Sequence, residues 1–276
     1  MRGRQFPLVF KFTFLVLVTA NAFAAPGDRY IVSDVDDTVK VTHVASTLDA
    51  VRRGLFSKLE FAGMSTLYRA IVEQNGKLPT RFVSGSPKQI KGIVSDFIQE
   101  NQFPQPWTLA LRTLPEDTAE FKIRRISAIL EKAPEDSRAI LIGDDGERDP
   151  EIYAILRDRY PRKIDRIYIH RVKGRALPAG EIGYDTAADV ALWELAAGRL
   201  RPYQLGNVAL AVMSESREDK DSLFLPEYCP RLTSARLTDQ LGPKLEPNAE
   251  QALGLARDTE VLIRQECEKS LLEAAD

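Results

Sequence analysis

Residues 30–34 read Tyr-Ile-Val-Ser-Asp and residues 139–144 read Ala-Ile-Leu-Ile-Gly-Asp, so each is a short apolar run that ends in polar residues. Runs of this length and composition are typical of strands that are buried on both faces of a sheet. Similar runs occupy 81–84, 107–111 and 167–169, and we expect 167–169 to be the last strand. Helical patterns separate these runs, which predicts an α/β fold with a parallel sheet between two helical layers.

Helices are expected between the strands. Their predicted positions are 44–59, 64–72, 87–97, 116–130 and a segment that begins at Asp149-Pro150. For the third of these, Ser86 is the expected N-cap and Pro87 the first helical residue. From Gly174 the pattern changes to a helix over 186–200, a polar loop over 214–221 and a long helix over 250–275. The sequence therefore predicts a core over 25–173 and a mostly helical C-terminal extension over 174–276.

The first 24 residues have the order of a secretory signal. Three basic residues precede an apolar run at 12–18, and Ala22-Phe23-Ala24 supplies a small-x-small cleavage site. The apolar stretch is shorter than the ~20 residues of a membrane-spanning helix, so cleavage after Ala24 is favoured over retention as an anchor. We therefore expect an exported chain, either periplasmic or secreted.

Composition limits the chemistry. The chain has 276 residues, with 38 Lys and Arg against 40 Asp and Glu, so no global basic field indicates a nucleic-acid binder. Two histidines and two cysteines argue against His-rich or Cys-rich metal sites. In an exported chain, Cys229 and Cys267 are expected to form a disulfide, and two separate buried thiols are the alternative. The remaining candidates for chemistry are carboxylates and hydroxyls.

Polar side chains follow three of the predicted strands. They are Asp34, Asp36, Asp37 and Thr38 after the first, Ser84, Gly85 and Ser86 after the second, and Asp144, Asp145 and Asp149 after a later one. Ligands of doubly wound sheets bind at the carboxyl ends of the strands, so these groups are expected to converge. Clustered carboxylates favour a cation, and oxygen ligands suit Mg²⁺. An ordinary turn, and an N-cap role for Asp149, are the structural alternatives.

Lys122 adds to this prediction. It shares a helix face with Ile126 and Ile129, so it is expected to point inward. A cation near a helix N-terminus is opposed by the helix dipole. Snorkelling of the side chain to solvent is the alternative, and an acidic, phosphate-binding cleft is the account we favour.

These residues resemble the four motifs of the haloacid dehalogenase superfamily. The motifs are Asp34-x-Asp36-x-Thr38, Ser84, Lys122 and Gly143-Asp144-x4-Asp149. The stretches 33–42, 83–87 and 143–153, with Gly63-Met64 and Leu67-Tyr68-Arg69, resemble one branch, the catalytic domain of actin-patch-associated phosphatidate phosphatases and their bacterial relatives. The resemblance covers roughly 28–172 and implies a Rossmannoid three-layer α/β/α core. Two positions depart from that branch: Asp145 stands where Ser is usual, and Phe121 where His is common.

The resemblance implies a role for each motif residue. Asp34 would be the nucleophile and Asp36 the general acid and base. Ser84 and Lys122, with Thr38 and Gly85, would bind the phosphoryl group. Asp34, the backbone carbonyl of Asp36, and Asp144 would hold Mg²⁺, supported by Asp149 or Asp145.

The expected substrate is phosphatidate or a related lipid phosphate. The segment between Thr38 and Phe61 is too short for a large cap domain, and an open site suits a bulky or membrane-borne substrate. The apolar stripe of 44–59 would contact lipid or, as we favour, the core. Three alternatives are an exported phosphatase for nucleotides or small phosphomonoesters, a non-catalytic phospho-ligand module, and a Ser-His-Asp hydrolase. The last is weak because Ser84 lacks a G-x-S-x-G turn.

Overall fold

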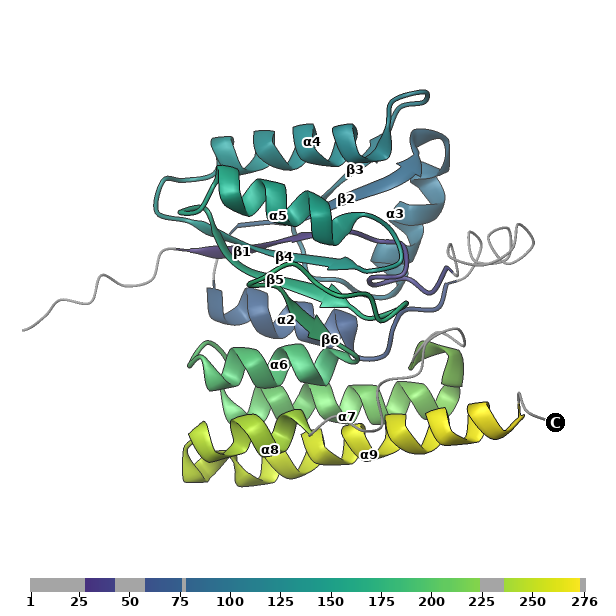
Figure 1. Ribbon diagram of the computed structural model, residues 1–276, viewed down its shortest axis with the longest axis vertical. Helices are drawn as coiled ribbons and strands as arrows, with labels where there is room; N and C mark the ends of the chain where they lie inside the picture. Colours follow the sequence, from purple (N-terminus) through teal and green to yellow (C-terminus); the bar gives the residue numbers. More distant parts are fainter. Residues whose placement is uncertain (1–27, 43–57, 76–77, 224–235, 274–276) are drawn as a thin grey trace, which may run out of the picture.

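The computed structural model describes residues 28–42, 58–75, 78–223 and 236–273 (Figure 1). Within these ranges one sheet of six parallel strands has the order β3-β2-β1-β4-β5-β6. The strands are β1 (Arg29–Ser33), β2 (Thr80–Pro87), β3 (Trp107–Arg112), β4 (Arg138–Asp144), β5 (Ile164–His170) and β6 (Ile182–Tyr184). The predicted α/β class and parallel sheet are confirmed. The expectation that 167–169 is the last strand was wrong, because the short run 182–184 pairs with β5.

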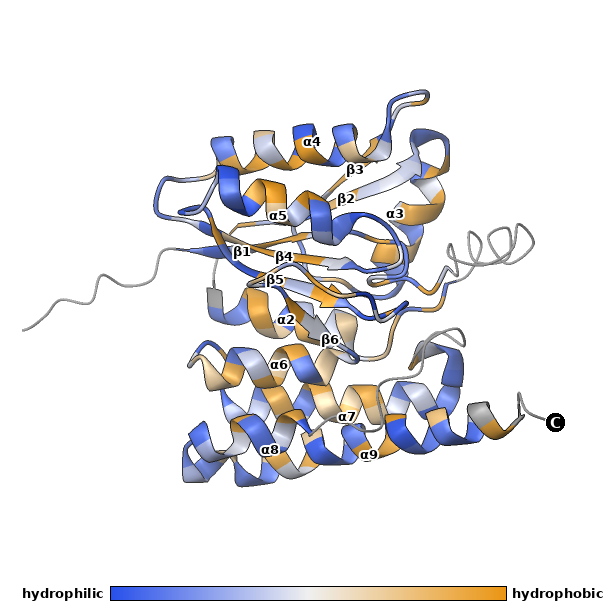
Figure 2. Ribbon diagram, viewed as in Figure 1, coloured by the Kyte–Doolittle hydropathy of each residue, from blue (hydrophilic) through white to orange (hydrophobic). Residues whose placement is uncertain are grey.

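Alternating residues of the strands divide the interior into two layers. Ile31 of β1 packs with the helices on one face, whereas Tyr30 and Val32 pack with those on the other. This alternation follows from the two-residue period of a strand. Figure 2 shows the resulting pattern, with apolar strands and helices that are apolar toward the sheet.

Helices cover both faces. The first face carries α2 (Met64–Asn75) and α3 (Lys91–Glu100), and the second carries α4 (Thr118–Lys132) and α5 (Asp149–Arg159). Helix α4 begins where the Asp117 side chain accepts hydrogen bonds from the N–H groups of Ala119 and Glu120, at 2.9 and 3.1 Å. Ser86 is not the N-cap that we expected. It lies in β2, and its hydroxyl bonds a carboxylate of the site described below.

The C-terminal part adds further helices below α2 (Figure 1). They are α6 (Ala187–Ala196), α7 (Pro202–Glu218), the five-residue α8 (Leu237–Leu241) and α9 (Glu250–Glu273). The predicted helical extension and the long terminal helix are confirmed. The prediction of a polar loop over 214–221 was wrong for residues 214–218. Those residues continue α7, because Ser216 and its apolar neighbour Val212 face the interior.

The extension and the sheet share one hydrophobic core. A single cluster of buried residues runs from Ile31 and Ile140 of the sheet through Leu67 of α2 to Val208 of α7 and Ile263 of α9. The sheet itself continues past residue 173, where we expected the core to end. The extension is therefore stabilised by packing on α2.

Gly63 permits this packing at the start of α2. Its φ is +79°, and a Cβ at this position would lie 2.7 Å from Cγ2 of Val212 on α7. Only glycine combines this conformation with so close an approach.

Several predictions fall outside the described residues. The signal segment (1–24), most of the helix expected over 44–59, and Cys229 are among them. Cys267 is buried and disulfide-bonded, and its pairing with Cys229 stays a prediction. In the described ranges, none of the helices has the length and apolar character needed to cross a membrane.

Candidate active site

The candidate site lies at the carboxyl ends of β1, β2 and β4. The chain leaves β1 toward β2 on one side, whereas β4 pairs with β1 on the other, so the strand order reverses between β1 and β4. Such a reversal opens a crevice at the carboxyl ends of the strands. Asp34 lies at this crevice, and its N–H donates a 2.9 Å hydrogen bond to the carbonyl of Ile142 on β4.

Three buried carboxylates meet there. Asp34, Asp144 and Asp149 each offer one oxygen, and these oxygens all lie within 4.8 Å of one another. Gly143 makes room for this acidic triad, because a Cβ at that position would lie 2.5 Å from Oδ2 of Asp149. Glycine before Asp144 is therefore required by the approach of Asp149 and not by its own backbone conformation.

Lys122 lies between two members of the acidic triad. Its Nζ is 3.0 Å from Oδ1 of Asp34 and 2.5 Å from Oδ1 of Asp149, and the side chain is 1% exposed. Burial acts to lower the pKa of Lys122, but the charges of Asp149 and Asp34 outweigh it and hold that pKa well above its usual value. The inward orientation predicted from the sequence is confirmed, and Lys122 is a buried ammonium ion.

The acidic triad has the properties of a cation site. Burial, followed by the neighbouring charge of Asp149, raises the pKa of Asp144, and burial is also the main cause of the raised pKa of Asp34. Three carboxylates and one ammonium leave two negative charges, which a divalent cation would balance. Among the described residues, Oδ2 of Asp149 is buried without a hydrogen-bond partner, and Oδ1 of Asp34 is buried with only the ion pair to Lys122. A buried carboxylate oxygen without a hydrogen bond is the kind of ligand that a hard cation requires.

Asp36 faces the neighbouring strand. Its Oδ2 accepts hydrogen bonds from the hydroxyls of Ser84 at 2.9 Å and Ser86 at 2.7 Å. Gly85 between these serines allows β2 to approach α4, since a Cβ there would lie 2.6 Å from Cγ2 of Thr118. The structure therefore brings Ser84 and Asp36 together, and it adds Ser86, which we had assigned to a helix cap.

Further contacts hold the loop that carries Asp36. The hydroxyl of Thr38 donates a 3.4 Å hydrogen bond to Asp144, and the Asp37 side chain accepts two hydrogen bonds from Thr42. Nδ1 of His170 lies 2.8 Å from the carbonyl oxygen of Asp37. Burial lowers the pKa of His170, so the neutral imidazole supports this loop. Ser84 and His170 thus have separate partners, and they do not form the pair that a Ser-His-Asp hydrolase needs.

Asp145 lies outside the acidic triad. Its carboxylate accepts hydrogen bonds from the N–H groups of Val172, Lys173 and Arg175, at 2.6 to 2.7 Å. Of the two supporting residues that the sequence left open, Asp149 lies with Asp34 and Asp144, whereas Asp145 ties the loop after β5 to the loop after β4.

Glu147 was missed by the sequence analysis. Its Oε2 lies 3.7 Å from Nζ of Lys122, its side chain is 38% exposed, and burial raises its pKa. It is therefore a partly accessible acidic group at the edge of the site. The only sequence signal was its position inside the stretch 143–153.

A parallel sheet with these carboxylates at its switch point is the architecture of the haloacid dehalogenase superfamily. Within it, the family model described as "Phosphatidate phosphatase APP1, catalytic domain" matches residues 29–171, and the chain belongs to this family. The predicted family resemblance is therefore confirmed.

Two fungal proteins are similar to part of the chain. An uncharacterized protein of Schizosaccharomyces pombe is 32% identical over an alignment of 152 residues that covers 51% of this chain and 25% of the relative. Phosphatidate phosphatase APP1 of Saccharomyces cerevisiae is 29% identical over an alignment of 157 residues that covers 53% of this chain and 26% of the relative. The chain thus spans about a quarter of the length of each.

Among solved structures, a chain titled "Structure of Pnkp1/Rnl/Hen1 complex" is similar over 63% of this chain and 52% of its own length, with 14% identity and a TM-score of 0.36. A likeness at this level carries no inference about function.

Proposed function

We propose that this chain is a phosphatase that hydrolyses a phosphomonoester through an aspartyl-phosphate on Asp34, with Mg²⁺ as cofactor. The observation that carries the proposal is the buried acidic triad with Lys122 between Asp34 and Asp149. Membership of a phosphatase catalytic-domain family supports it.

The first step is the formation of the covalent intermediate. A carboxylate oxygen of Asp34 attacks phosphorus, the bond from phosphorus to the ester oxygen breaks, and the carboxyl group of Asp36 gives its proton to that oxygen. The hydroxyls of Ser84 and Ser86 orient Asp36 for this transfer. Lys122 balances the negative charge of the phosphoryl oxygens in this proposal.

In the second step, Asp36 accepts a proton from water, the water oxygen attacks phosphorus, and the bond to Asp34 breaks to release phosphate. Asp34, Asp144 and Asp149, with the backbone carbonyl of Asp36, would hold the metal ion. When bound, the ion screens the negative charges of the nucleophile and the substrate.

We propose phosphatidate or a related lipid phosphate as the substrate, in the periplasm or outside the cell. The family description and the name of the yeast relative support the lipid, and the signal-like residues 1–24 support export. Nucleotides and small phosphomonoesters are the second candidate class. A module that only binds phospho-ligands is disfavoured, because such a module does not need Asp36 as a general acid and base.

The test is phosphate release by the purified chain from phosphatidate, lysophosphatidate, nucleotides and p-nitrophenyl phosphate, with Mg²⁺ or with EDTA. We expect release only with the divalent cation, and the highest kcat/KM on a lipid phosphate. Full activity in EDTA would exclude the metal-assisted mechanism. Preference for nucleotides would contradict the proposed lipid substrate but not the proposed mechanism.

A further inference from the structure

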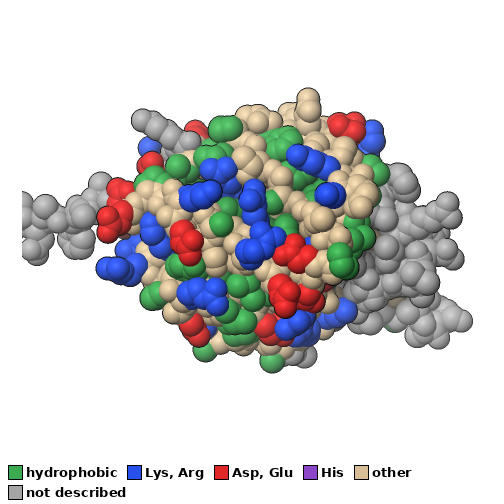
Figure 3. Space-filling model, turned by 90° about the horizontal axis from the view of Figure 1, so that it is seen from above, with side chains coloured by type: hydrophobic (Ala, Val, Ile, Leu, Met, Phe, Trp, Pro, Cys, Tyr) green, Lys and Arg blue, Asp and Glu red, His purple; other side chains and the backbone are tan. Residues whose placement is uncertain are grey.

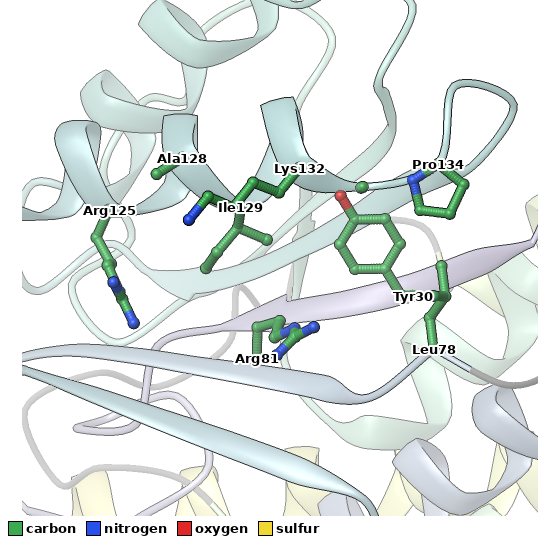
Figure 4. A pocket seen from close by; sticks show the side chains of 9 residues that line it. Tyr30, Leu78, Arg81, Arg125, Ala128, Ile129, Lys132 and Pro134 are labelled. Carbon is green, nitrogen blue, oxygen red and sulfur yellow. The ribbon is translucent and has the colours of Figure 1, made fainter.

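A pocket lies at the opposite end of the strands from the acidic triad. It has a volume of about 270 Å³ and lies between the later turns of α4 and the amino ends of β1 and β2 (Figure 4). Tyr30 is the second residue of β1, whereas Asp34 follows its last residue, so the strand separates them by about 13 Å. The pocket is therefore distinct from the candidate active site.

Three cationic side chains line this pocket. They are Arg81 of β2 and Arg125 and Lys132 of α4, and none of the nine lining residues is acidic. Among the described residues, no hydrogen bond or ion pair is found for Arg125 or Lys132, and Arg81 donates to the hydroxyl of Thr108 at 3.2 Å. Figure 3 looks onto the α4 side of the molecule, where Lys and Arg side chains lie across the middle of the face with Asp and Glu side chains among them. The pocket thus concentrates positive charge without an internal counterion.

The Tyr30 hydroxyl is an unpaired donor at the same place. The residue is 3% exposed, and its hydroxyl is buried without a hydrogen-bond partner in the part of the chain that the structure describes. In Figure 4 the Tyr30 ring rises from β1 and its hydroxyl points toward α4, near Pro134, whereas the nitrogen of Lys132 lies further along the pocket, near Ile129. Burial raises the pKa of Tyr30 to about 12, against the opposing charge of Arg81, so the hydroxyl keeps its proton at neutral pH. A buried donor without a partner is costly unless a ligand accepts its hydrogen bond.

The remaining walls are apolar. They are formed by Leu78, Ala128, Ile129, Ala133 and Pro134. Guanidinium groups match the oxygens of phosphate in pairs, and three positive charges more than balance a phosphate dianion. The volume is close to the lower limit for small-molecule sites, which selects a compact ligand.

We propose that this pocket binds the phosphate group of a small phosphorylated ligand with an apolar body, held by Arg81, Arg125, Lys132 and the Tyr30 hydroxyl. A free phosphate ester and the headgroup of a lipid phosphate share this chemistry. The site requires neither the metal ion nor turnover, so it stands or fails independently of the proposed phosphatase activity.

The test is calorimetric titration of the full chain in EDTA with phenylphosphonate, whose phosphorus–carbon bond resists hydrolysis. We expect saturable binding that weakens about tenfold or more in the double variant Arg125→Gln/Lys132→Gln, and to a smaller extent in Tyr30→Phe. Both basic side chains are exposed, so their loss leaves the core intact.

Two control variants separate this pocket from other sites. Arg124→Gln removes the same charge from the same helix, but Arg124 pairs with Glu116 outside the pocket. Ser84→Ala alters the candidate active site. Both are expected to bind phenylphosphonate as the wild type does. The proposal is overturned if the wild type shows no saturable binding, or if Ser84→Ala weakens binding and the double variant does not.

A second arm identifies the source of the phosphate. With vesicles that contain phosphatidate, loss of vesicle binding in the double variant supports a lipid headgroup. Unchanged vesicle binding together with weakened phenylphosphonate binding supports a soluble ester.

Discussion

At the scale of single residues, the candidate site holds more negative charge than its burial would tolerate in an ordinary core. Asp34, Asp144 and Asp149 are each at most 2% exposed, and among the described residues Lys122 pairs with two of them, Asp34 and Asp149. Buried charges that are only partly paired destabilise a fold, and they are typical of sites that bind ions or perform catalysis. We therefore expect these buried charges to lower the stability of the fold, a cost that the proposed function of the site explains.

Asp34→Asn tests whether these charges lower stability and support activity. We expect it to lower phosphatase activity by more than about a hundredfold, since it removes the proposed nucleophile, and to leave the melting temperature in EDTA equal or higher, since it relieves repulsion in the acidic triad. Asp136→Asn, an exposed carboxylate elsewhere, is the matched control and should change neither quantity. Activity above about a hundredth of wild type would contradict covalent catalysis by Asp34, because acid–base help alone contributes ~10²–10⁴.

At the scale of elements, the start of α2 packs closely against α7 at Gly63. Its N–H donates a 2.7 Å hydrogen bond to Glu215 of α7, and its missing side chain admits Val212. Two residues upstream, Phe61 packs against His170, which itself supports the loop of the candidate site. The contact between α2 and α7 thus lies next to the end of the sheet that carries the candidate site.

Gly63→Ala is expected to lower the free energy of unfolding by roughly 2 kcal/mol or more, because a positive φ costs ~1–2 kcal/mol and overpacking adds to it. Val212→Ala in the same chain should restore part of the loss by removing the clashing Cγ2. Gly92→Ala on α3 is the control, since nothing lies within 4 Å of its added Cβ and a gain of about 0.5–1 kcal/mol is expected. Urea unfolding measures all three, and equal effects at positions 63 and 92 would refute the packing argument.

Glu60 gives this region a dependence on pH. Burial, followed by the charge of Glu215, raises the pKa of Glu60 from 4.5 to about 8, and Ser65 donates a 3.0 Å hydrogen bond to it. A pKa raised by folding means that the neutral form is favoured in the folded state. Its contribution to stability is therefore complete below about pH 4.5 and is lost as the pH rises toward 8.

Glu60→Gln removes this titration and keeps an acceptor for Ser65. The variant should be more stable than wild type at pH 8.5, and the difference in melting temperature should shrink toward pH 5. Glu268→Gln, at an exposed position of α9, is the control and should show no such trend. A difference that is constant from pH 5 to 8.5 would rule out Glu60 as the titrating group.

At the scale of the whole molecule, the sheet, α2 and the C-terminal helices share a continuous core. Leu67 and Ile71 of α2 are fully buried, and α2 contacts both the sheet and α7. The region that matches the family model ends at 171, before β6 and the C-terminal helices. The family region alone would therefore expose apolar surface of α2 to water.

A chain cut after residue 173 should not fold cooperatively. We expect it to bind a hydrophobic dye and to melt without a sharp transition by circular dichroism, because α2 loses the helices that cover it. The full chain, prepared in parallel, is the reference. A soluble fragment with a sharp melting transition would instead show that residues 25–173 form the separate domain that the sequence predicted.

The sequence by itself determined the parallel α/β class, the family, and the residues that gather at the carboxyl ends of the strands. These features depend on local patterns: apolar runs set the strands, and Asp34, Ser84 and Asp144 are placed by the strand that precedes each. The inward direction of Lys122 followed in the same way from the period of its helix. Local information was sufficient because a strand fixes where its next residue lies.

Only the tertiary structure decided which polar groups contact each other. Asp145 and Asp149 are equally acidic and close in sequence, but the loop after β5 supplies N–H groups to Asp145, whereas Gly143 and Lys122 admit Asp149 to the site. Ser86 bonds Asp36 from the neighbouring strand, and β6 and α7 were not predicted because their burial comes from partners far away in the chain. Contacts between distant segments depend on the three-dimensional path of the backbone, which no local window of sequence contains.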